Sequence, residues 1–299
     1  MAIHVRGLTY AYDAGTPREH KALRGVDVHV ARGSFTAVVG PVGSGKSTLV
    51  QHFNGLLRPT SGRVEVLGID VGRASPGELR RLRQRVGIVF QYPEHQLFAE
   101  TVGADVAFGP KQMGLSVEEV EARVDEALAA VGLPLELKHR SPFALSGGQR
   151  RRAAIAGVLA MGPEVLIMDE PAAGLDPRGR RDMFDLMSRW HAEGKTIVFV
   201  THDMDAVAEW ADHVIVMHRG KQVLTGPPRR VFAQASMLEA IGLDVPQVTR
   251  VLLELQRRGL PVDAHRYTVE EAVDHLASLR SIPRADGHRK DGQAACRDR

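Results

Sequence analysis

The sequence predicts an α/β domain with a mostly parallel central sheet, followed by a small helical extension. Short apolar runs rich in β-branched residues alternate with stretches of helical periodicity, which is typical of α/β folds. Four of the five runs end at a polar or glycine-rich segment, where ligands bind in open α/β sheets. The runs that predict buried strands are Phe35–Val39, Val86–Phe90, Val165–Met168, Ile197–Val200 and Val214–Met217.

The segments around these strands carry helix and turn signals. Val117–Val131 has an apolar residue at every third or fourth position, which predicts an amphipathic helix. Arg219-Gly220-Lys221 predicts a hairpin after the last strand, and the breaker Gly226-Pro227-Pro228 predicts a boundary just beyond it.

We therefore expect a main domain over residues 1–227 and a helical extension over 228–281. The extension is predicted to hold two amphipathic helices, Gln247–Arg257 and Val269–Leu279. Residues 282–299 are polar and charged and are expected to form a disordered tail.

Composition narrows the class of protein. With 299 residues, 43% of them hydrophobic and 25% charged, the chain is expected to be globular. The single cysteine, Cys296, excludes a disulfide framework within one chain and fits a reducing, cytosolic setting. The net charge of +3 lies entirely within residues 280–299, so we expect no nucleic-acid partner. No signal peptide and no membrane-spanning run is evident, so any membrane anchor would come from another chain.

A phosphate-binding loop follows the first of the predicted strands. The pattern G-x-x-x-x-G-K-[ST] stands between that strand and a helical stretch, Ser47–Phe53, which is the context that the motif requires. Its glycines allow backbone N–H groups to surround phosphate oxygens, Lys46 would reach the β- and γ-phosphates, and the Ser47 hydroxyl suits Mg²⁺. The alternative is a glycine-rich turn that binds nothing. The residues expected to bind ATP here are Gly40, Pro41, Val42, Gly43, Ser44, Gly45, Lys46, Ser47 and Thr48.

Two carboxylates end a second predicted strand. Asp169 and Glu170 follow the apolar run Val165–Met168, where burial would be costly unless they meet a cation and water. Asp169 is expected to hold Mg²⁺ through a water, and Glu170 to orient and deprotonate the attacking water. Alone, the segment would more simply be a strand that ends in a solvated acidic turn.

Further motifs in a fixed order identify a family. Leu145-Ser146-Gly147-Gly148-Gln149 precedes an apolar helix, Gln91 follows a strand, Ala173-Gly174-Leu175-Asp176 follows the acidic pair, and His202 follows Ile197–Val200. Together with the phosphate loop, this series resembles the ATP-binding cassette (ABC) ATPases over roughly residues 3–225. The resemblance implies a P-loop NTPase domain with a helical signature subdomain, which uses ATP and Mg²⁺.

In that family two cassettes pack head to tail, and each ATP lies between the phosphate loop of one subunit and the signature sequence of the other. The resemblance therefore implies that Ser146, Gly147, Gly148 and Gln149 contact the facing subunit's ATP. Their N–H groups at a helix start would form a second anion cradle. The simpler alternative for Ser146 is a helix N-cap, and the two roles are compatible.

The other motif residues take their roles from the same resemblance. Gln91 would contact Mg²⁺ and the attacking water, although a lone Gln in a loop is more often a surface residue. His202 would bond the γ-phosphate, and Asp176 would order the facing subunit's site. Tyr12 would stack on adenine, with Tyr10 as a competitor on the same strand face.

Several segments most resemble the ATPases of energy-coupling factor (ECF) transporters, which drive vitamin and metal-ion uptake, and in particular the second of their two ATPase types. They include Tyr10–Pro17, Phe53–Gly62, Gly87–Phe98, Phe108–Pro110 and Ile155–Met161. This implies a homologous ATPase partner or a second copy, a transmembrane scaffold subunit and a substrate-binding membrane subunit. It also implies a peripheral site at the cytoplasmic face of the membrane and a dimerisation role for the extension. The chain departs from this type at Pro41-Val42 and Ala172.

The segment Tyr92–Phe98 is the predicted docking site for the scaffold subunit. We expect Glu94, His95 and Gln96 to face the partner, whereas Leu97 and Phe98 could equally pack inward. Two alternative functions remain at this stage: the ATPase subunit of another ABC transporter class, and a non-transport ABC ATPase. The absence of a long coiled coil and of a second cassette disfavours the latter.

Overall fold

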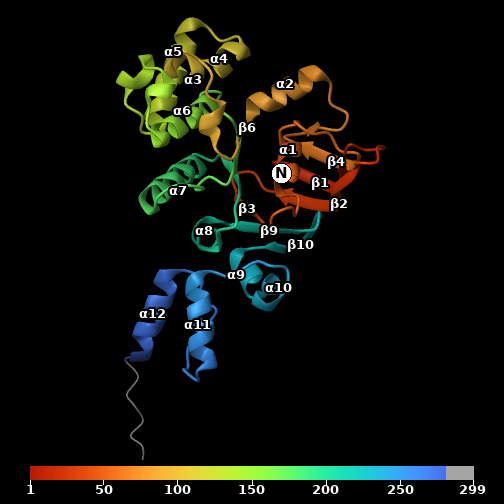
Figure 1. The fold of residues 1–299 in the computed structure, drawn as a ribbon, viewed down its shortest axis with the longest axis vertical. Helices are drawn as coiled ribbons and strands as arrows, with labels where there is room; N and C mark the ends of the chain where they lie inside the picture. The colour runs from red at the N-terminus through yellow and green to blue at the C-terminus, as the bar shows by residue number, and fades with distance from the viewer. Residues whose placement is uncertain (281–299) are drawn as a thin grey trace, which may run out of the picture.

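The computed structural model describes residues 1–280 and contains two β-sheets, a helical lobe and a C-terminal extension (Figure 1). The predicted tail 282–299 and Cys296 lie outside the described residues. No helix in the described part of the chain combines the length and apolar character that crossing a membrane requires.

The larger sheet has six strands in the order β10-β9-β3-β8-β7-β6. Five of them run parallel, and β10 pairs antiparallel with β9, so the predicted hairpin is confirmed. All five strands predicted from apolar runs are present in this sheet. The bounds of the six strands of the sheet are β3 (Phe35–Val39), β6 (Val86–Val89), β7 (Val165–Asp169), β8 (Thr196–Val200), β9 (His213–His218) and β10 (Lys221–Gly226).

A second, antiparallel sheet was not predicted. Its order is β2-β1-β4-β5, and its strands are β1 (Ile3–Tyr12), β2 (His20–Val30), β4 (Ser61–Val66) and β5 (Ile69–Asp70). Helix α1 (Lys46–Phe53) buries Leu49, Val50 and Phe53 in a core shared with residues of both sheets. This packing holds the start of α1, and with it the phosphate loop, between two rigid layers.

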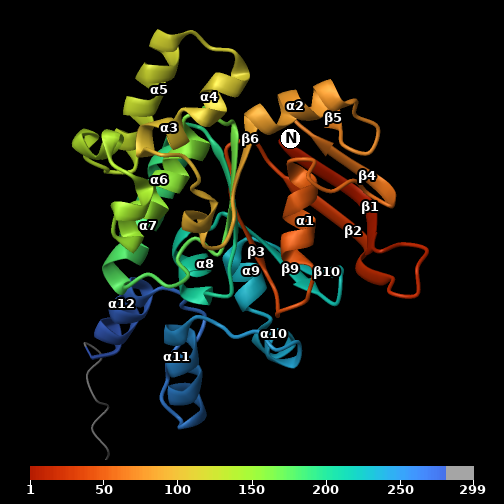
Figure 2. The same ribbon diagram turned by 45° about the horizontal axis from the view of Figure 1, so that its top comes forward.

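The helical lobe lies at one side of the large sheet (Figure 2). It consists of α3 (Val102–Val106), α4 (Phe108–Met113), α5 (Val117–Ala130) and α6 (Gly147–Leu159). Helix α5 confirms the predicted amphipathic helix and begins at a capping box between Ser116 and Glu119. The remaining helices of the main body are α2 (Pro76–Arg85), α7 (Pro177–Ala192) and α8 (Met204–Trp210).

The C-terminal part begins with α9 (Pro228–Phe232) and α10 (Ala235–Ala240) and ends with α11 (Gln247–Arg257) and α12 (Val269–Arg280). Both predicted amphipathic helices are confirmed. Phe232, Leu238 and Val245 belong to the main core, whereas Leu252, Val262, Ala264 and Ala272 form a separate cluster between α11 and α12. The domain boundary at residue 227 stays a prediction, because the main core continues through it and includes Phe232, Val245 and Tyr267 of the extension.

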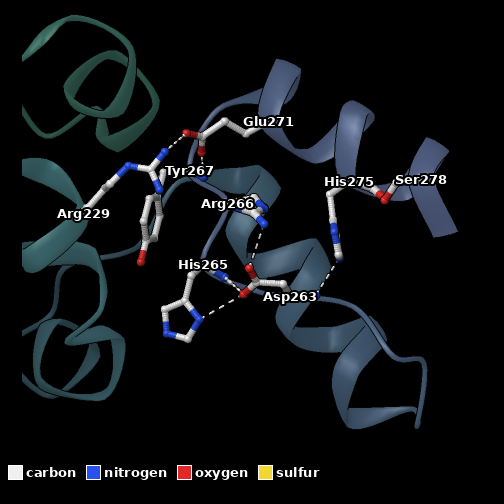
Figure 3. A network of polar contacts seen from close by, with 8 residues as sticks. All are labelled: Arg229, Asp263, His265, Arg266, Tyr267, Glu271, His275 and Ser278. Carbon is white, nitrogen blue, oxygen red and sulfur yellow. Dashed lines mark hydrogen bonds and ion pairs between the residues drawn. The ribbon is translucent and has the colours of Figure 1, made fainter.

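Polar contacts hold the extension together (Figure 3), and a further hydrogen bond joins it to the body. The Arg229 guanidinium pairs with Glu271 on α12, and the other oxygen of Glu271 accepts from the Tyr267 backbone N–H at 2.9 Å. His275 Nε2 accepts from the Asp263 N–H at 2.7 Å. At the start of α11, the Gln247 N–H donates to Asp205 of α8 at 2.8 Å, which joins the extension to the body.

Candidate functional site

The phosphate loop connects β3 to α1, as the motif predicts. Two of its glycines are required by close approach. A Cβ on Gly40 would collide with the Met217 carbonyl and lie 2.6 Å from Ser44 Oγ, and one on Gly45 would lie 2.8 Å from the Ala22 carbonyl oxygen. Both also have positive φ, which favours glycine. The loop is therefore packed too closely to accept a Cβ at either glycine.

Lys46 folds over this cradle. Its ammonium donates to the carbonyls of Gly40 at 2.7 Å and Pro41 at 2.9 Å. Burial lowers the pKa of Lys46, while the carboxylates of Glu170 and Asp169 oppose that shift. The Ser44 hydroxyl is buried without a hydrogen-bond partner among the described residues, so the cradle holds a polar group that an anionic ligand would satisfy.

Asp169 and Ser47 meet across the end of the sheet. The Ser47 hydroxyl donates to the Asp169 carboxylate, and burial is the main cause of a raised pKa at Asp169. A hydroxyl and a carboxylate are hard oxygen ligands, which Mg²⁺ prefers. Residues 1–280 contain no cluster of three or more His, Cys, Asp or Glu side chains that could enclose a metal. The donor set fits an ion that phosphate oxygens and water would complete.

Glu170 is held by its backbone and by His202. Its φ of 50° is in the left-handed region, which is strained for a non-glycine residue, and its N–H donates to the Val200 carbonyl at 2.9 Å. The His202 Nδ1–H donates to Glu170 Oε1 at 2.9 Å, with His202 largely exposed and Glu170 largely buried. The two residues predicted to act on water are thus brought together.

A buried arginine beside this loop was missed by the sequence reasoning. Arg151 on α6 is 5% exposed and donates to the carbonyls of Ala173 at 2.6 Å, Pro171 at 2.8 Å and Glu170 at 3.3 Å. It stands within Arg150-Arg151-Arg152, and a run of arginines is usually a solvated face. Arg151 is buried whereas Arg150 and Arg152 are only partly buried, and the sequence gives no signal for this.

The signature residues begin helix α6. The Ser146 hydroxyl accepts from the Gln149 N–H at 3.3 Å, and the Ser146 N–H donates to the Gln149 side chain at 3.0 Å, so the N-cap alternative is confirmed. A Cβ at Gly147 or Gly148 would have nothing within 4 Å, and neither residue has a positive φ. Neither backbone conformation nor space within this chain requires glycine there.

The remaining predicted residues lie at the edges of these motifs. Gln91 is exposed in the loop after β6. Asp176 caps α7, where its carboxylate accepts from the Gly179 N–H at 2.7 Å. In the docking segment, His95 and Gln96 are exposed, Glu94 is partly buried, Leu97 is buried and Phe98 is 63% exposed. Of the two residues that could pack inward, only Leu97 does.

Tyr10 and Tyr12 share one strand face, with ring centroids 4.9 Å apart. Tyr10 also packs edge-on against the buried ring of His52, and burial raises the pKa of Tyr10. Tyr12 is the more open of the two at 38% exposure, and its hydroxyl lies 3.2 Å from Thr48 Oγ1. Tyr12 therefore has the face available for stacking.

A groove of about 670 Å³ separates the helical lobe from α2 and β6. Its lining is mostly apolar and includes Phe98, Phe108, Met113 and Met161. The exposed rings of Phe98 and Phe108 meet edge to face at its mouth, 5.2 Å apart. The docking segment thus borders a groove, which the sequence reasoning did not identify.

Comparisons with known proteins agree on one family. The ABC transporter family profile matches residues 23–173. The "Energy-coupling factor transporter ATP-binding protein EcfA2" of Symbiobacterium thermophilum is 52% identical over 282 residues, 94% of this chain and 96% of that protein. The EcfA2 protein of Caldanaerobacter subterraneus is 48% identical over 277 residues, 92% of this chain and 96% of that protein.

Solved structures show the same architecture. CbiO1 from Clostridium perfringens, part of the ABC transporter complex cbiONQ, is 42% identical with a TM-score of 0.71, covering 86% of this chain and 97% of that one. A dimeric post-hydrolysis state of the ATP-binding cassette MJ0796, bound to ADP and Pi, is 29% identical with a TM-score of 0.69, covering 76% and 98%. The predicted P-loop NTPase fold is therefore confirmed.

Proposed function

Because the chain belongs to the ATP-binding proteins of energy-coupling factor transporters, we propose that it binds and hydrolyses ATP to power an ECF-type importer. Vitamins, other micronutrients or metal ions would be the cargo. The expected partners are a homologous ATPase or a second copy, a transmembrane scaffold subunit and a substrate-binding membrane subunit. The chain would sit peripherally at the cytoplasmic face of the membrane.

One observation carries the proposed chemistry: Glu170 and His202 lie in hydrogen-bond contact beside the Asp169–Ser47 pair, in which Asp169 is partly buried and Ser47 is exposed. A carboxylate held by a histidine can orient a water and accept its proton. This arrangement stands at the carboxyl ends of parallel strands, next to the phosphate cradle.

The chain's own groups would divide the work of hydrolysis. The loop amides and Lys46 would hold the β- and γ-phosphates, Glu170 would accept the proton of the attacking water, and His202 would position that water and the γ-phosphate. Ser47, Asp169 and Gln91 would hold Mg²⁺, which would neutralise charge on the phosphates. Tyr12 would stack on adenine.

The facing subunit would complete the site. Gly147 and Gly148 are open at the start of α6, although nothing within this chain requires glycine at either position. Close approach of a phosphate from another chain would explain both, because amides at a helix start bind anions. Asp176, at the N-cap of α7, would lie beside the facing site.

The Glu170→Gln substitution tests this assignment. The amide cannot accept the proton of water, so ATP should still bind while turnover falls by at least about a hundredfold. Steady-state ATPase assays and size-exclusion chromatography in MgATP should show lost turnover and a trapped closed dimer.

Asp176→Asn makes the same kind of carboxylate-to-amide change at a residue that is not proposed to act on the attacking water. It should retain more activity than Glu170→Gln, because the amide oxygen can still cap α7. Near-normal hydrolysis by the Glu170→Gln variant would contradict the assignment of Glu170 as the base.

We also propose that the groove beside Tyr92–Phe98 docks the scaffold subunit. The exposed phenyl rings of Phe98 and Phe108 offer an apolar anchor, and His95 and Gln96 supply polar contacts at its rim. Glu94 is a weaker candidate than sequence suggests, because one of its carboxylate oxygens is buried.

Replacing Glu94, His95 and Gln96 by Ala, or Phe98 by Ser, should uncouple ATPase from transport in cells that carry the native membrane subunits. Nucleotide binding by the purified chain should not change. Val117→Ser removes a comparably exposed apolar side chain outside the groove and should have no effect. Unchanged assembly and uptake in the groove variants would refute the docking site.

A further inference from the structure

The side chain of Arg151 connects two motifs that lie apart in the sequence, the signature helix and the loop after β7. It lies in the first turns of α6, five residues after the N-cap Ser146, and its two terminal nitrogens reach the loop that follows β7. That loop begins with Glu170. The contacts span about twenty residues of sequence, from 151 to the carbonyls of residues 170, 171 and 173.

The geometry of the contact suits positioning rather than charge pairing. All three acceptors are backbone carbonyls, and a planar guanidinium presents several N–H donors in a fixed fork. Arg151 is 5% exposed, so the packing around it fixes the directions in which its N–H groups point. Burial lowers the pKa of Arg151, and the carboxylate of Glu94 opposes that shift.

The loop that Arg151 holds needs an external restraint. Glu170 has a positive φ, and residues 170–174 belong to neither a strand nor a helix. A non-glycine residue in the left-handed region persists only when its surroundings fix it. Here His202 fixes the side chain of Glu170, the Val200 carbonyl fixes its N–H, and Arg151 fixes its carbonyl and those just after it.

We propose that Arg151 is the positioning residue for Glu170, and that it locks the catalytic loop to the start of the signature helix. This rests on the proposed function, in which Glu170 acts on the chain's own ATP and Ser146–Gly148 contact the facing subunit's ATP. Arg151 then connects Glu170, which acts at the chain's own ATP site, to the signature, which acts at the ATP site of the facing subunit.

Arg151→Met tests the proposal, because it keeps the length of the side chain and removes its donors. We expect kcat to fall by about tenfold or more, since small displacements of a catalytic group are costly, while KM and the affinity for a fluorescent ATP analogue change less than about twofold. Arg151→Lys keeps the charge and one donor direction and should recover part of kcat.

Arg123→Met is the matched control. Arg123 donates to the Ala160 carbonyl at the other end of α6, at 3.3 Å, and does not touch the catalytic loop. It should leave kcat unchanged. All assays are run well below the melting temperature of each variant, so that unfolding does not enter kcat.

A double-mutant cycle separates positioning from general structural support. If Arg151 acts through Glu170, Arg151→Met should cost far less in single-turnover rate when Glu170→Gln is already present. Equal losses in both backgrounds, or a kcat for Arg151→Met within about twofold of the unmodified chain, would overturn the positioning role alone. Wild-type turnover by Glu170→Gln would overturn the proposed base, and the positioning role with it.

Discussion

Asp169 pairs with Val200 in the sheet and carries a carboxylate that the fold disfavours in its ionised form. Burial raises its pKa above the ordinary value of 3.8, and neither the Ser47 hydroxyl nor the Lys46 charge cancels that effect. The free energy of unfolding therefore contains a penalty from Asp169 whenever the carboxylate is ionised. Such a cost is expected where a residue is kept for binding a cation rather than for stability.

Asp169→Asn should raise the melting temperature of the nucleotide-free protein at neutral pH. A group with a raised folded pKa stabilises the fold below its ordinary pKa and loses that contribution as pH rises through the folded value. The advantage of the Asn variant should thus shrink between about pH 7 and about pH 4. Thermal denaturation across this range measures it, and MgATP should stabilise the unmodified chain far more than the variant.

The exposed Asp274 provides a control, because Asp274→Asn should change the melting temperature little at any pH. A melting temperature for Asp169→Asn that equals or falls below that of the unmodified chain at pH 7 would show that the ionised carboxylate is not penalised.

Single residues were predictable from sequence where the chemistry is local. The phosphate loop needs glycine at close approaches and a lysine beside it, and these requirements appear as a contiguous motif. The Glu170–His202 contact joins residues 32 positions apart, and its two motifs were predicted individually. Arg151 could not be predicted, because its partners are backbone carbonyls, which leave no side-chain pattern in the sequence.

At the scale of elements, the large parallel sheet was predictable and the antiparallel sheet was not. Strands buried on both faces form continuous apolar runs such as Phe35–Val39, all of whose residues are buried. The strands β1 and β2 bury one face and expose the other, and register shifts interrupt their pairing, so their alternation is irregular. Such strands are hard to distinguish from loops by composition.

Helix α12 presents an apolar row to solvent. Val269, Val273 and Leu276 follow one another at helical spacing and are 64%, 57% and 37% exposed, while Ala272 packs inward against α11. An unpartnered row of this kind fits the dimerisation role that we expect for the extension. The polar network of Arg229, Tyr267 and Glu271 would hold α12 in place beneath it (Figure 3).

Val273→Asp should therefore weaken self-association without unfolding the chain. The expected change is a rise of at least about tenfold in the dimer dissociation constant by analytical ultracentrifugation, with a nearly unchanged melting temperature, because a charge would be buried in an apolar interface. Ser278→Asp adds the same charge at an exposed position of the same helix outside the row and should not affect association. Equal effects of both changes would contradict a role for this row.

At the scale of the whole molecule, the two proposed anion cradles lie in different parts of the structure. The phosphate loop lies at the start of α1 between the sheets, and the signature lies at the start of α6 in the helical lobe (Figure 2). The helical lobe and the part of the body formed by α2 and β6 enclose the groove proposed for docking. Movement of the helical lobe would therefore change the positions of both the signature and the groove. Enzyme turnover and contact with a membrane subunit would then depend on the same rearrangement.

Gly148→Asp tests the contribution that the signature of one chain makes to the ATP site of the facing chain. A Cβ at Gly148 meets nothing within 4 Å and the backbone φ there is not positive, so the substitution should leave the fold and the chain's own phosphate loop intact. In the proposed dimer, however, the new carboxylate would meet the facing subunit's phosphates. We expect nearly unchanged ATP binding and melting temperature, with turnover reduced by at least about a hundredfold, since like charges repel strongly in a closed site.

The same geometry predicts that the turnover per chain of the unmodified protein rises with protein concentration until the dimer is saturated. A dilution series would measure the ATPase turnover per chain at each concentration, and light scattering on the same samples would measure the fraction of dimer. Full turnover by a strict monomer, or by Gly148→Asp, would mean that one chain encloses its nucleotide alone, and the open glycines of α6 would then need another explanation.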